Sequence, residues 1–268
     1  MHDGPGVRTT VFFKGCPLRC LWCHNPEGIG RKPQLLITKT GCLHCGKCEQ
    51  PCGHPECAPF DRCTKICPKG LIKVAGTEVD ARELAEQLKQ QADFLADGGI
   101  TLSGGEPMYQ PEFLMELLEA LKPLHTVIET SGHVSQEIFQ MAAKACSIVY
   151  LDVKHMDSAV HRRLTGVGNS LIQKNLGWML SQSRPFVVRV PLIPGLNDSA
   201  ENLTALARRL EGAKAPVKVE FLPYNPFTGA KYEMAEMEFT LKEIDGNSYH
   251  PVIPEKEFEQ RNIPFEVL

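Results

Sequence analysis

Short apolar runs rich in β-branched and aromatic residues alternate with Leu-rich stretches along most of this chain. The apolar runs predict six strands, over residues 8–13, 100–103, 126–129, 148–152, 186–190 and 217–222. Apolar residues at helical spacing predict five helices, over residues 80–97, 111–121, 135–145, 169–181 and 199–210. Because a helix precedes each strand after the first, the strands must pair in parallel through right-handed crossovers.

Six strand–helix units fall short of the eight that close a full barrel. The sequence therefore predicts an α/β protein with an open, partial TIM-like (β/α)6 barrel. The helix over residues 80–97 has clear end signals, since Asp80 can cap it, Glu83 occupies the capping-box position and Gly98 follows its end. Residues 234–267 lack motifs and are expected to close the arc with a helix and an edge strand.

Polar or reactive residues follow the carboxyl ends of all six predicted strands. They are Cys16, Gly104, Gly105, Glu106, Glu129, Thr130, Asp152, Lys154, Arg189, Tyr224 and Asn225. In barrel-like α/β proteins this edge is the rim at which ligands bind. Because packing does not account for polar residues at six successive strand ends, the sequence predicts a binding site at the rim.

Three cysteines follow the first predicted strand with the spacing C-x3-C-x2-C. They are Cys16, Cys20 and Cys23, with Trp22 directly before the third. Three thiolates on a [4Fe–4S] cluster would leave one iron open, and an open coordination position is typical of catalytic metal sites. The alternatives are a structural zinc site completed by His24 or three unrelated buried thiols.

Residues 41–70 contain seven cysteines and few long apolar side chains, so they cannot build a hydrophobic core. We therefore divide the chain into the start of the core (residues 1–40), a cysteine-rich ferredoxin-like insert (residues 41–75) and the remainder of the core (residues 76–268). A C-x2-C-x2-C-x3-C run in the insert matches the bacterial ferredoxin motif and predicts a [4Fe–4S] cluster. Its cysteines are Cys42, Cys45, Cys48 and Cys52.

A second cysteine run ends in the Cys-Pro pair typical of ferredoxins. It consists of Cys57, Cys63 and Cys67. Its remaining cysteine would stand at position 60, where the chain has Phe60, so seven cysteines are present where two clusters need eight. The second site would take Asp61, His54 or an external ligand, or would lack one iron. A pair of zinc knuckles is the alternative that the same spacings permit.

Composition restricts the partners of the protein. A formal net charge of −3 and a pI of about 6.3 give no electrostatic reason for binding nucleic acid or an anionic membrane. No apolar run approaches the length of a spanning helix, and no signal peptide precedes the cysteine triad. We therefore expect a cytoplasmic protein, in which crowded cysteines indicate metal ligation rather than disulfides.

The segment over residues 2–15 reads His-Asp-Gly-Pro-Gly-Val-Arg-Thr-Thr-Val-Phe-Phe-Lys-Gly and runs into the cysteine triad. It resembles the radical S-adenosylmethionine (SAM) activating enzymes of glycyl radical enzymes, a family like pyruvate formate-lyase activating enzyme. The resemblance returns at residues 104–107, 152–154 and 189–195. The cysteine-rich residues 41–75 favour the subgroup of this family whose members carry a ferredoxin-like insert. Family members usually carry another strand-like segment before this run, whereas this chain begins at Met1, as a truncated N-terminus would.

The resemblance implies roles for residues of the rim. The catalytic set would be Cys16, Cys20, Cys23 and Lys154. The residues that would contact SAM are Trp22, Gly104, Gly105, Glu106, Thr130, Asp152, Lys154, Arg189, Pro191 and Asn225. Backbone groups of the Gly104-Gly105 turn would accept hydrogen bonds from the SAM amino group, and Arg189 would pair with its carboxylate. The alternative for the Gly-Gly turn is simple chain geometry.

The resemblance also implies a monovalent cation between Glu129 and Asp152, with Thr130 and Tyr150 nearby. Two carboxylates left unpaired at a crowded rim would repel each other, which favours a cation between them. The alternative for Asp152 and Lys154 is a surface ion pair that contributes little. Asn225 stands where some family members have histidine.

The implied activity is reductive cleavage of SAM to methionine and a 5′-deoxyadenosyl radical, which abstracts a glycine α-hydrogen from a partner glycyl radical enzyme. The insert would relay electrons from a flavodoxin or ferredoxin type of reductant, or dock the partner, and we expect a monomer. One alternative is an electron-transfer or iron–sulfur scaffold protein. Another is a radical SAM enzyme acting on a small molecule or peptide.

Overall fold

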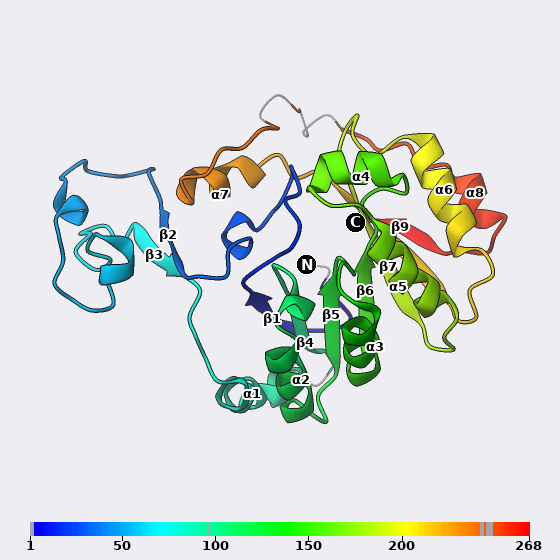
Figure 1. The fold of residues 1–268 in the computed structure, drawn as a ribbon, viewed down its shortest axis with the longest axis horizontal. Helices are drawn as coiled ribbons and strands as arrows, with labels where there is room; N and C mark the ends of the chain where they lie inside the picture. The colour runs from blue at the N-terminus through cyan, green and yellow to red at the C-terminus, as the bar shows by residue number, and fades with distance from the viewer. Residues whose placement is uncertain (1–2, 96, 242–243, 245–248) are drawn as a thin grey trace.

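A computed structural model describes residues 3–95, 97–241, 244 and 249–268, so the predicted motif residue His2 lies outside the described residues. Within this part of the chain, seven strands form one parallel sheet in the order β1-β4-β5-β6-β7-β8-β9 (Figure 1). Their bounds are Arg8–Phe13, Gly99–Gly104, Thr126–Thr130, Ile148–Asp152, Phe186–Leu192, Val217–Pro223 and Phe265–Val267. The six predicted strands and the open α/β arc are confirmed, and β9 is the predicted edge strand.

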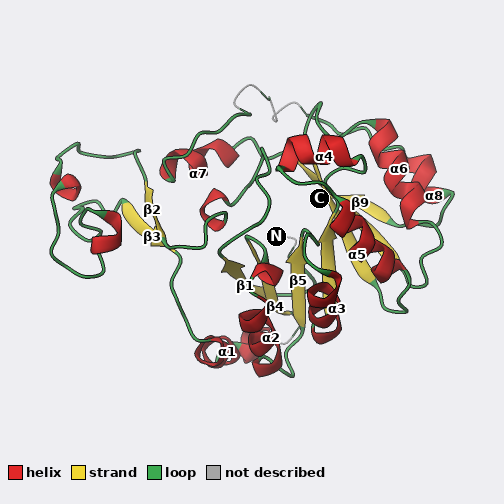
Figure 2. Ribbon diagram, viewed as in Figure 1, coloured by secondary structure: helices red, strands yellow, loops and turns green. Residues whose placement is uncertain are grey.

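Eight α-helices connect and cover these strands in the described residues (Figure 2). From α1 to α8 they span Ala81–Lys89, Pro111–Ala120, Gln136–Ala145, Ser158–Thr165, Ser170–Leu180, Ala200–Leu210, Thr228–Met234 and Glu255–Glu259. Helices α1, α2, α3 and α5 pack side by side in this order and bury their apolar stripes against the sheet. None of the helices described is both long and apolar enough to cross a membrane.

The predicted helix over residues 80–97 is too long. Asp80 caps it as predicted, since its carboxylate accepts hydrogen bonds from the backbone N–H groups of the first turn. The helix α1 ends at Lys89, and a 3₁₀ turn at Ala92–Leu95 follows. The polar residues after Lys89 have no core to face, and the turn suffices to bury Leu95.

A two-stranded antiparallel sheet, which the sequence analysis did not predict, joins the cysteine-rich segment to the core. Strand β2 (Gln34–Ile37) pairs with β3 (Ile72–Ala75), so the chain leaves and re-enters through neighbouring strands. Figure 1 shows this pair at the base of a cysteine-rich loop that extends away from the parallel sheet. Helix α7 packs against β2 and supports the pair from the core side.

The end of the chain is fastened by an aromatic cluster. Phe221 of β8 is fully buried and makes edge contacts with Phe258 of α8 and Phe265 of β9, with ring centroids 5.5 and 6.1 Å apart. Such contacts add to the hydrophobic free energy of burial. The predicted closing helix, α8, and the predicted edge strand, β9, therefore both pack against the Phe221 side chain.

We expect Phe221→Ala to lower the free energy of unfolding by about 3–5 kcal/mol, because it leaves a cavity under both α8 and β9. Phe94→Ala is the matched control, since the Phe94 side chain is 81% exposed and its loss should change stability by less than about 0.5 kcal/mol. Anaerobic chemical denaturation measures both. Equal effects of the two substitutions would contradict the docking role of Phe221.

Candidate functional site

A pocket at the carboxyl end of the parallel sheet brings together most of the predicted site residues. Those that line it are Cys16, Cys20, Trp22, Cys23, Gly104, Gly105, Glu129, Thr130, Asp152, Lys154, Arg189 and Pro191. His24, Ser103 and Ser131 line the same pocket and were not assigned to SAM from the sequence. Of the residues assigned to SAM, Glu106 and Asn225 are not among those that line the pocket.

The cysteine loop after β1 is held in place from two sides. On one side, the backbone N–H groups of Arg19 and Leu21 donate to the carbonyl groups of Thr165 and Leu164, at the end of α4. On the other side, the Cys16 N–H donates to the Ile29 carbonyl over 3.1 Å. Trp22 is buried in an apolar cluster with Leu164, Ile193, Tyr224, Tyr232 and Phe239. The positions of the three thiols are thus set by the core.

Helix α4 supports this loop but was missed in the sequence analysis. Its sequence has no leucine stripe, which is the pattern that revealed the other helices. Two end signals could have revealed it. The Asp157 carboxylate accepts from the Val160 N–H, and Gly166 ends the helix with a left-handed φ of 83°.

The three thiols are unsuited to act as free nucleophiles. Burial raises the pKa of Cys16 and of Cys20 to about 12, and burial also raises the pKa of Cys23. Buried thiols with raised pKa values stay protonated and unreactive unless a cationic centre stabilises the thiolates. A positively charged metal centre would supply that stabilisation.

The spacing of the thiols favours a cluster over a single ion. Among the described residues, Cys16, Cys20 and Cys23 do not form a group whose sulfur atoms all lie within 4.8 Å of one another. Thiolates that share one zinc ion lie closer, because each sits about 2.3 Å from the same centre. Thiolates that bind different iron atoms of a cluster are held farther apart. The triad therefore fits an iron–sulfur cluster.

The Gly104-Gly105 turn is fixed by close backbone contact with the cysteine loop. The Glu106 N–H donates to the Gly15 carbonyl over 2.9 Å. A Cβ atom on Gly105 would lie 2.5 Å from the Gly15 carbonyl oxygen and 2.6 Å from that of Gly28. A side chain at this position would push the two loops apart, so glycine is required.

Glu106 acts as a buried clamp between two strand ends. Its carboxylate accepts hydrogen bonds from Met108 N–H, Thr130 Oγ1 and both Ser131 N–H and Ser131 Oγ, over 2.6–3.1 Å. Burial raises the pKa of Glu106, although the four hydrogen bonds act in the opposite direction. Thr130, which was expected near a cation, has its hydroxyl engaged in this clamp.

The two rim carboxylates are each paired with a basic side chain rather than left unpaired, although Asp152 still acts to raise the pKa of Glu129. Glu129 accepts from Arg189 Nη1 and Ser103 Oγ, and Asp152 accepts from Lys154 Nζ over 2.7 Å. Burial alone would lower the pKa of Lys154, but Asp152 and the nearby cysteines keep it above its usual value. Lys154 is 8% exposed, so this pair is no surface ion pair. A cation at this place remains a prediction.

Arg189 keeps one donor available. Its Nε donates to Glu220 Oε2 over 2.9 Å and its guanidinium stacks on the Tyr150 ring at 4.3 Å. Its Nη2 is buried and has no hydrogen-bond partner within the described part of the chain. Buried donors are normally paired, so this atom fits an acceptor on a ligand in the pocket.

Two further residues, Asn225 and Cys146, do not line the pocket. Asn225 is exposed, and its side chain accepts from the Phe227 N–H at the start of α7. Its predicted contact with SAM stays a prediction. Cys146 is buried, as expected of a small hydrophobe, and burial raises its pKa to about 11.

The insert holds its cysteines in two groups that interleave the two sequence runs. Cys67, from the second run, lines a hollow together with Cys42, Cys45 and Cys48. Cys52, from the first run, lies beside Cys57, with both sulfur atoms and a ring nitrogen of His54 within 4.8 Å of one another. Exchange of the last cysteine between runs is the arrangement of two-cluster ferredoxins.

The sheet is an open parallel α/β arc, as in partial barrels, and three free thiols lie at its carboxyl rim, where barrel-like proteins bind ligands. Residues 10–207 match the family model described as the radical SAM superfamily. The choline trimethylamine-lyase activating enzyme of Oleidesulfovibrio alaskensis is 39% identical over 92% of this chain and 86% of its own length. The isethionate sulfite-lyase activating enzyme of the same organism is 36% identical over 91% of this chain and 86% of its own.

A solved domain of a pyruvate-formate lyase-activating enzyme from Bacteroides vulgatus shares the fold, with a TM-score of 0.51 and 24% identity over 64% of this chain and 99% of that one. The chain therefore belongs to the radical SAM superfamily and, within it, to the activating enzymes of glycyl radical enzymes. Membership of this superfamily implies a [4Fe–4S] cluster and SAM. The wide thiol spacing and the unpaired Arg189 Nη2 fit these two groups.

We expect Glu106→Ala to lower the free energy of unfolding by at least about 2 kcal/mol, because it leaves four buried donors without an acceptor. Glu86→Ala is the control, since Glu86 is exposed on α1 and should cost less than about 0.5 kcal/mol. Denaturation of both variants in the same buffer measures the difference. A Glu106 variant as stable as the control would show that the clamp does not hold the rim together.

Proposed function

We propose that this protein activates a glycyl radical enzyme by cleaving SAM reductively and abstracting an α-hydrogen from a glycine of its partner. The observation that supports this most is the set of three free thiols, not all within 4.8 Å of one another, that lines a pocket together with charged side chains at the rim of a radical SAM arc. The relatives, which are activating enzymes by name, support the same activity.

Cys16, Cys20 and Cys23 would hold the [4Fe–4S] cluster through three of its irons. When bound, the cluster supplies the electron that cleaves SAM to methionine and a 5′-deoxyadenosyl radical. The chain contributes fixed positions for the thiols and an apolar wall at Trp22 that limits access of water. Only a dry, preorganised site can direct so reactive a radical to one hydrogen atom.

The polar wall of the pocket would bind SAM. The SAM amino group would meet backbone carbonyl groups of the Gly104-Gly105 turn, which Glu106 holds in place from behind. The SAM carboxylate would accept from Arg189 Nη2, the donor left unpaired in the described residues.

The other residues assigned to SAM would form the rest of its site. Asp152, paired with Lys154, would face the adenosine, and Pro191 would line its edge. Thr130 would contribute through the Glu106 clamp, and Asn225 would reach the ribose only from outside the pocket.

A monovalent cation between Glu129 and Asp152 belongs to the same proposal. It would need to share these carboxylates with Arg189 and Lys154, which already bind them. The cation would therefore bind together with SAM. Once the Arg189 guanidinium pairs with the SAM carboxylate, it neutralises Glu129 less completely, which favours a cation there.

The insert would carry a second [4Fe–4S] cluster on one of its two cysteine groups. That group is Cys42, Cys45, Cys48 and Cys67. A cluster there would relay electrons from a flavodoxin or ferredoxin type of reductant or form part of the surface that docks the partner. We expect the protein to act as a monomer, and the relatives suggest a partner that acts on choline or on an organosulfonate.

Alanine at Cys16, Cys20 or Cys23 should abolish formation of 5′-deoxyadenosine from SAM in anaerobically reconstituted, reduced protein, because the cluster loses one of its three ligands. Mixed with a choline-type or organosulfonate-type glycyl radical enzyme, the parent should generate a glycyl radical signal in electron paramagnetic resonance. Cys146→Ala is the matched control and should retain both readouts.

Triad variants that make 5′-deoxyadenosine at the parent rate would exclude this site. SAM cleavage without a glycyl radical on either partner would instead favour the alternative, a radical SAM enzyme that acts on a small molecule or peptide. Loss of both activities in Cys146→Ala as well would point to general unfolding rather than to the triad.

Arg189→Lys should weaken SAM binding by roughly 10- to 100-fold, because lysine cannot bind Glu129, Glu220 and a ligand carboxylate with one planar fork. Arg208→Lys, at an exposed position of α6, is the control and should leave the Kd for SAM unchanged. Equilibrium binding to the oxidised, cluster-loaded protein measures both. An unchanged Kd for the Arg189 variant would remove it from the SAM site.

A further inference from the structure

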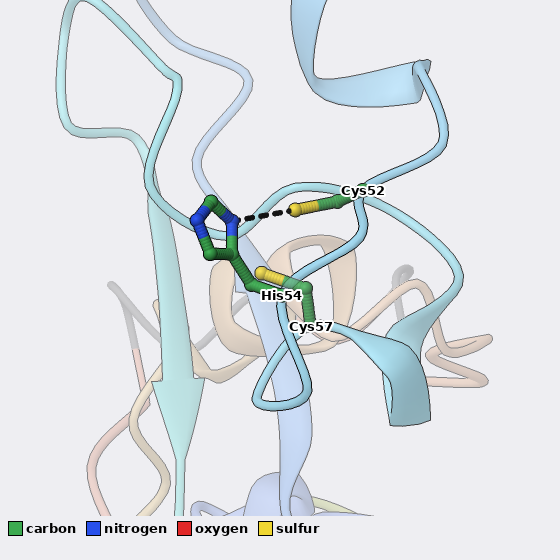
Figure 3. A group of neighbouring side chains, drawn as sticks. All are labelled: Cys52, His54 and Cys57. Carbon is green, nitrogen blue, oxygen red and sulfur yellow. Dashed lines mark hydrogen bonds between the residues drawn. The ribbon is translucent and has the colours of Figure 1, made fainter.

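The second cysteine group of the insert includes a histidine. Figure 3 shows Cys52, His54 and Cys57 turned toward one another in the loop. Cys52 Sγ lies 3.2 Å from His54 Nδ1, and the three ligand atoms all lie within 4.8 Å of one another. Within the described residues, this is the one set of three His, Cys, Asp or Glu side chains gathered so closely.

A third thiol stands at the edge of this set. Cys63 is a neighbour of both Cys52 and Cys57 but is not part of the set within 4.8 Å, so a bound ion would have to draw its sulfur atom inward. Phe60 occupies the position from which a ferredoxin run would supply the fourth thiolate, so the group has three cysteines and a neighbouring histidine. Asp61, the other candidate from the sequence, is exposed and is not part of the close set.

The spacing of the Cys52, His54 and Cys57 ligand atoms fits one metal ion. Ligands of a single tetrahedral ion lie about 2.0–2.3 Å from a common centre and hence within 4.8 Å of one another. The ligands of a cubane cluster bind different irons and stand farther apart, as the thiols of the Cys16, Cys20 and Cys23 triad do. The two sites differ in the way expected of a single ion and a cluster.

We propose that Cys52, His54, Cys57 and Cys63 bind one zinc ion in a tetrahedral Cys3His site. Three thiolates and one imidazole are a common ligand set of structural zinc, whereas this chain lacks the eighth cysteine of a two-cluster ferredoxin. The insert then carries one iron–sulfur cluster and one zinc ion. This inference goes beyond the proposed function, since the zinc site takes no part in SAM cleavage.

The zinc ion would hold the insert in shape. Residues 41–70 have few long apolar side chains, and the 3₁₀ turns at Lys47–Glu49 and Ala58–Phe60 bury no residue. Because the two cysteine runs interleave, a metal that joins Cys52 to Cys63 also fixes the neighbouring residues Cys48 and Cys67 of the other group. Zinc has no redox chemistry, so it would stabilise the cluster site without competing for its electrons.

Metal analysis of the full-length protein, purified anaerobically from medium that contains both iron and zinc, tests the proposal. We expect about one zinc per chain, with X-ray absorption at the zinc edge showing three sulfur neighbours at about 2.3 Å and one nitrogen at about 2.0–2.1 Å. His54→Asn should remove the nitrogen signal and weaken zinc binding by at least roughly 10-fold in chelator competition, since even loss of an outer partner of a ligand costs that much.

His44→Asn is the matched control. His44 lies beside the other cysteine group, and asparagine tolerates its left-handed φ of 48°. This variant and Asp61→Asn should keep the zinc and its nitrogen neighbour. Retained iron at the other sites of His54→Asn will show that the variant is folded.

Two results would overturn the zinc site. One is a parent protein that contains no zinc, together with a Phe60→Cys variant that binds more iron and sulfide than the parent. That pair of results would identify a ferredoxin cluster that lacks one ligand. The other is zinc that His54→Asn leaves unchanged. Neither result bears on SAM cleavage at the Cys16 triad, so failure here is distinguishable from failure of the proposed function.

Discussion

Parallel pairing between β1 and β4 is the constraint on which the site depends. Phe13 stands opposite Gly104, so the chain leaves both strands at the same edge of the sheet and at the same height. The cysteine loop and the Gly-Gly turn then run side by side, close enough that only glycine fits at position 105. A shift of this register by one residue would reverse the faces of β1 and separate the thiols from the rest of the pocket.

Charge at the rim follows from the same geometry. Because neighbouring parallel strands end together, Asp152 lies opposite Arg189 in the register, and Glu129 reaches the same guanidinium. Buried charges are stable only when they are paired, and each of these carboxylates has a cationic partner. The network is therefore paired without any ligand, and within the described residues it leaves Arg189 Nη2 without a partner.

The parts of the structure that depend on local sequence could be predicted, and those that depend on distant contacts could not. The strands, most helix positions and the rim location of the cysteine triad follow from periodicity and spacing. The partners of Glu129 could not be predicted, because Ser103 and Arg189 are far from it in sequence. The exchange of Cys52 and Cys67 between groups depends likewise on how the loop closes, although the ferredoxin pattern hinted at it. Helix α4 was missed because it is short and its apolar face offers little more than Val160 and Leu164.

The antiparallel pair β2 and β3 has a consequence for the evolution of the insert. It is a short ladder through which the chain both enters and leaves the cysteine-rich loop. Adding or removing residues in matched pairs would lengthen or shorten this ladder by about 3.4 Å per pair while preserving backbone pairing. Electron tunnelling slows steeply with distance, so in the electron-relay role proposed for the insert the length of the ladder would act as a spacer that tunes the rate of electron delivery without any change to the cysteine groups at either end.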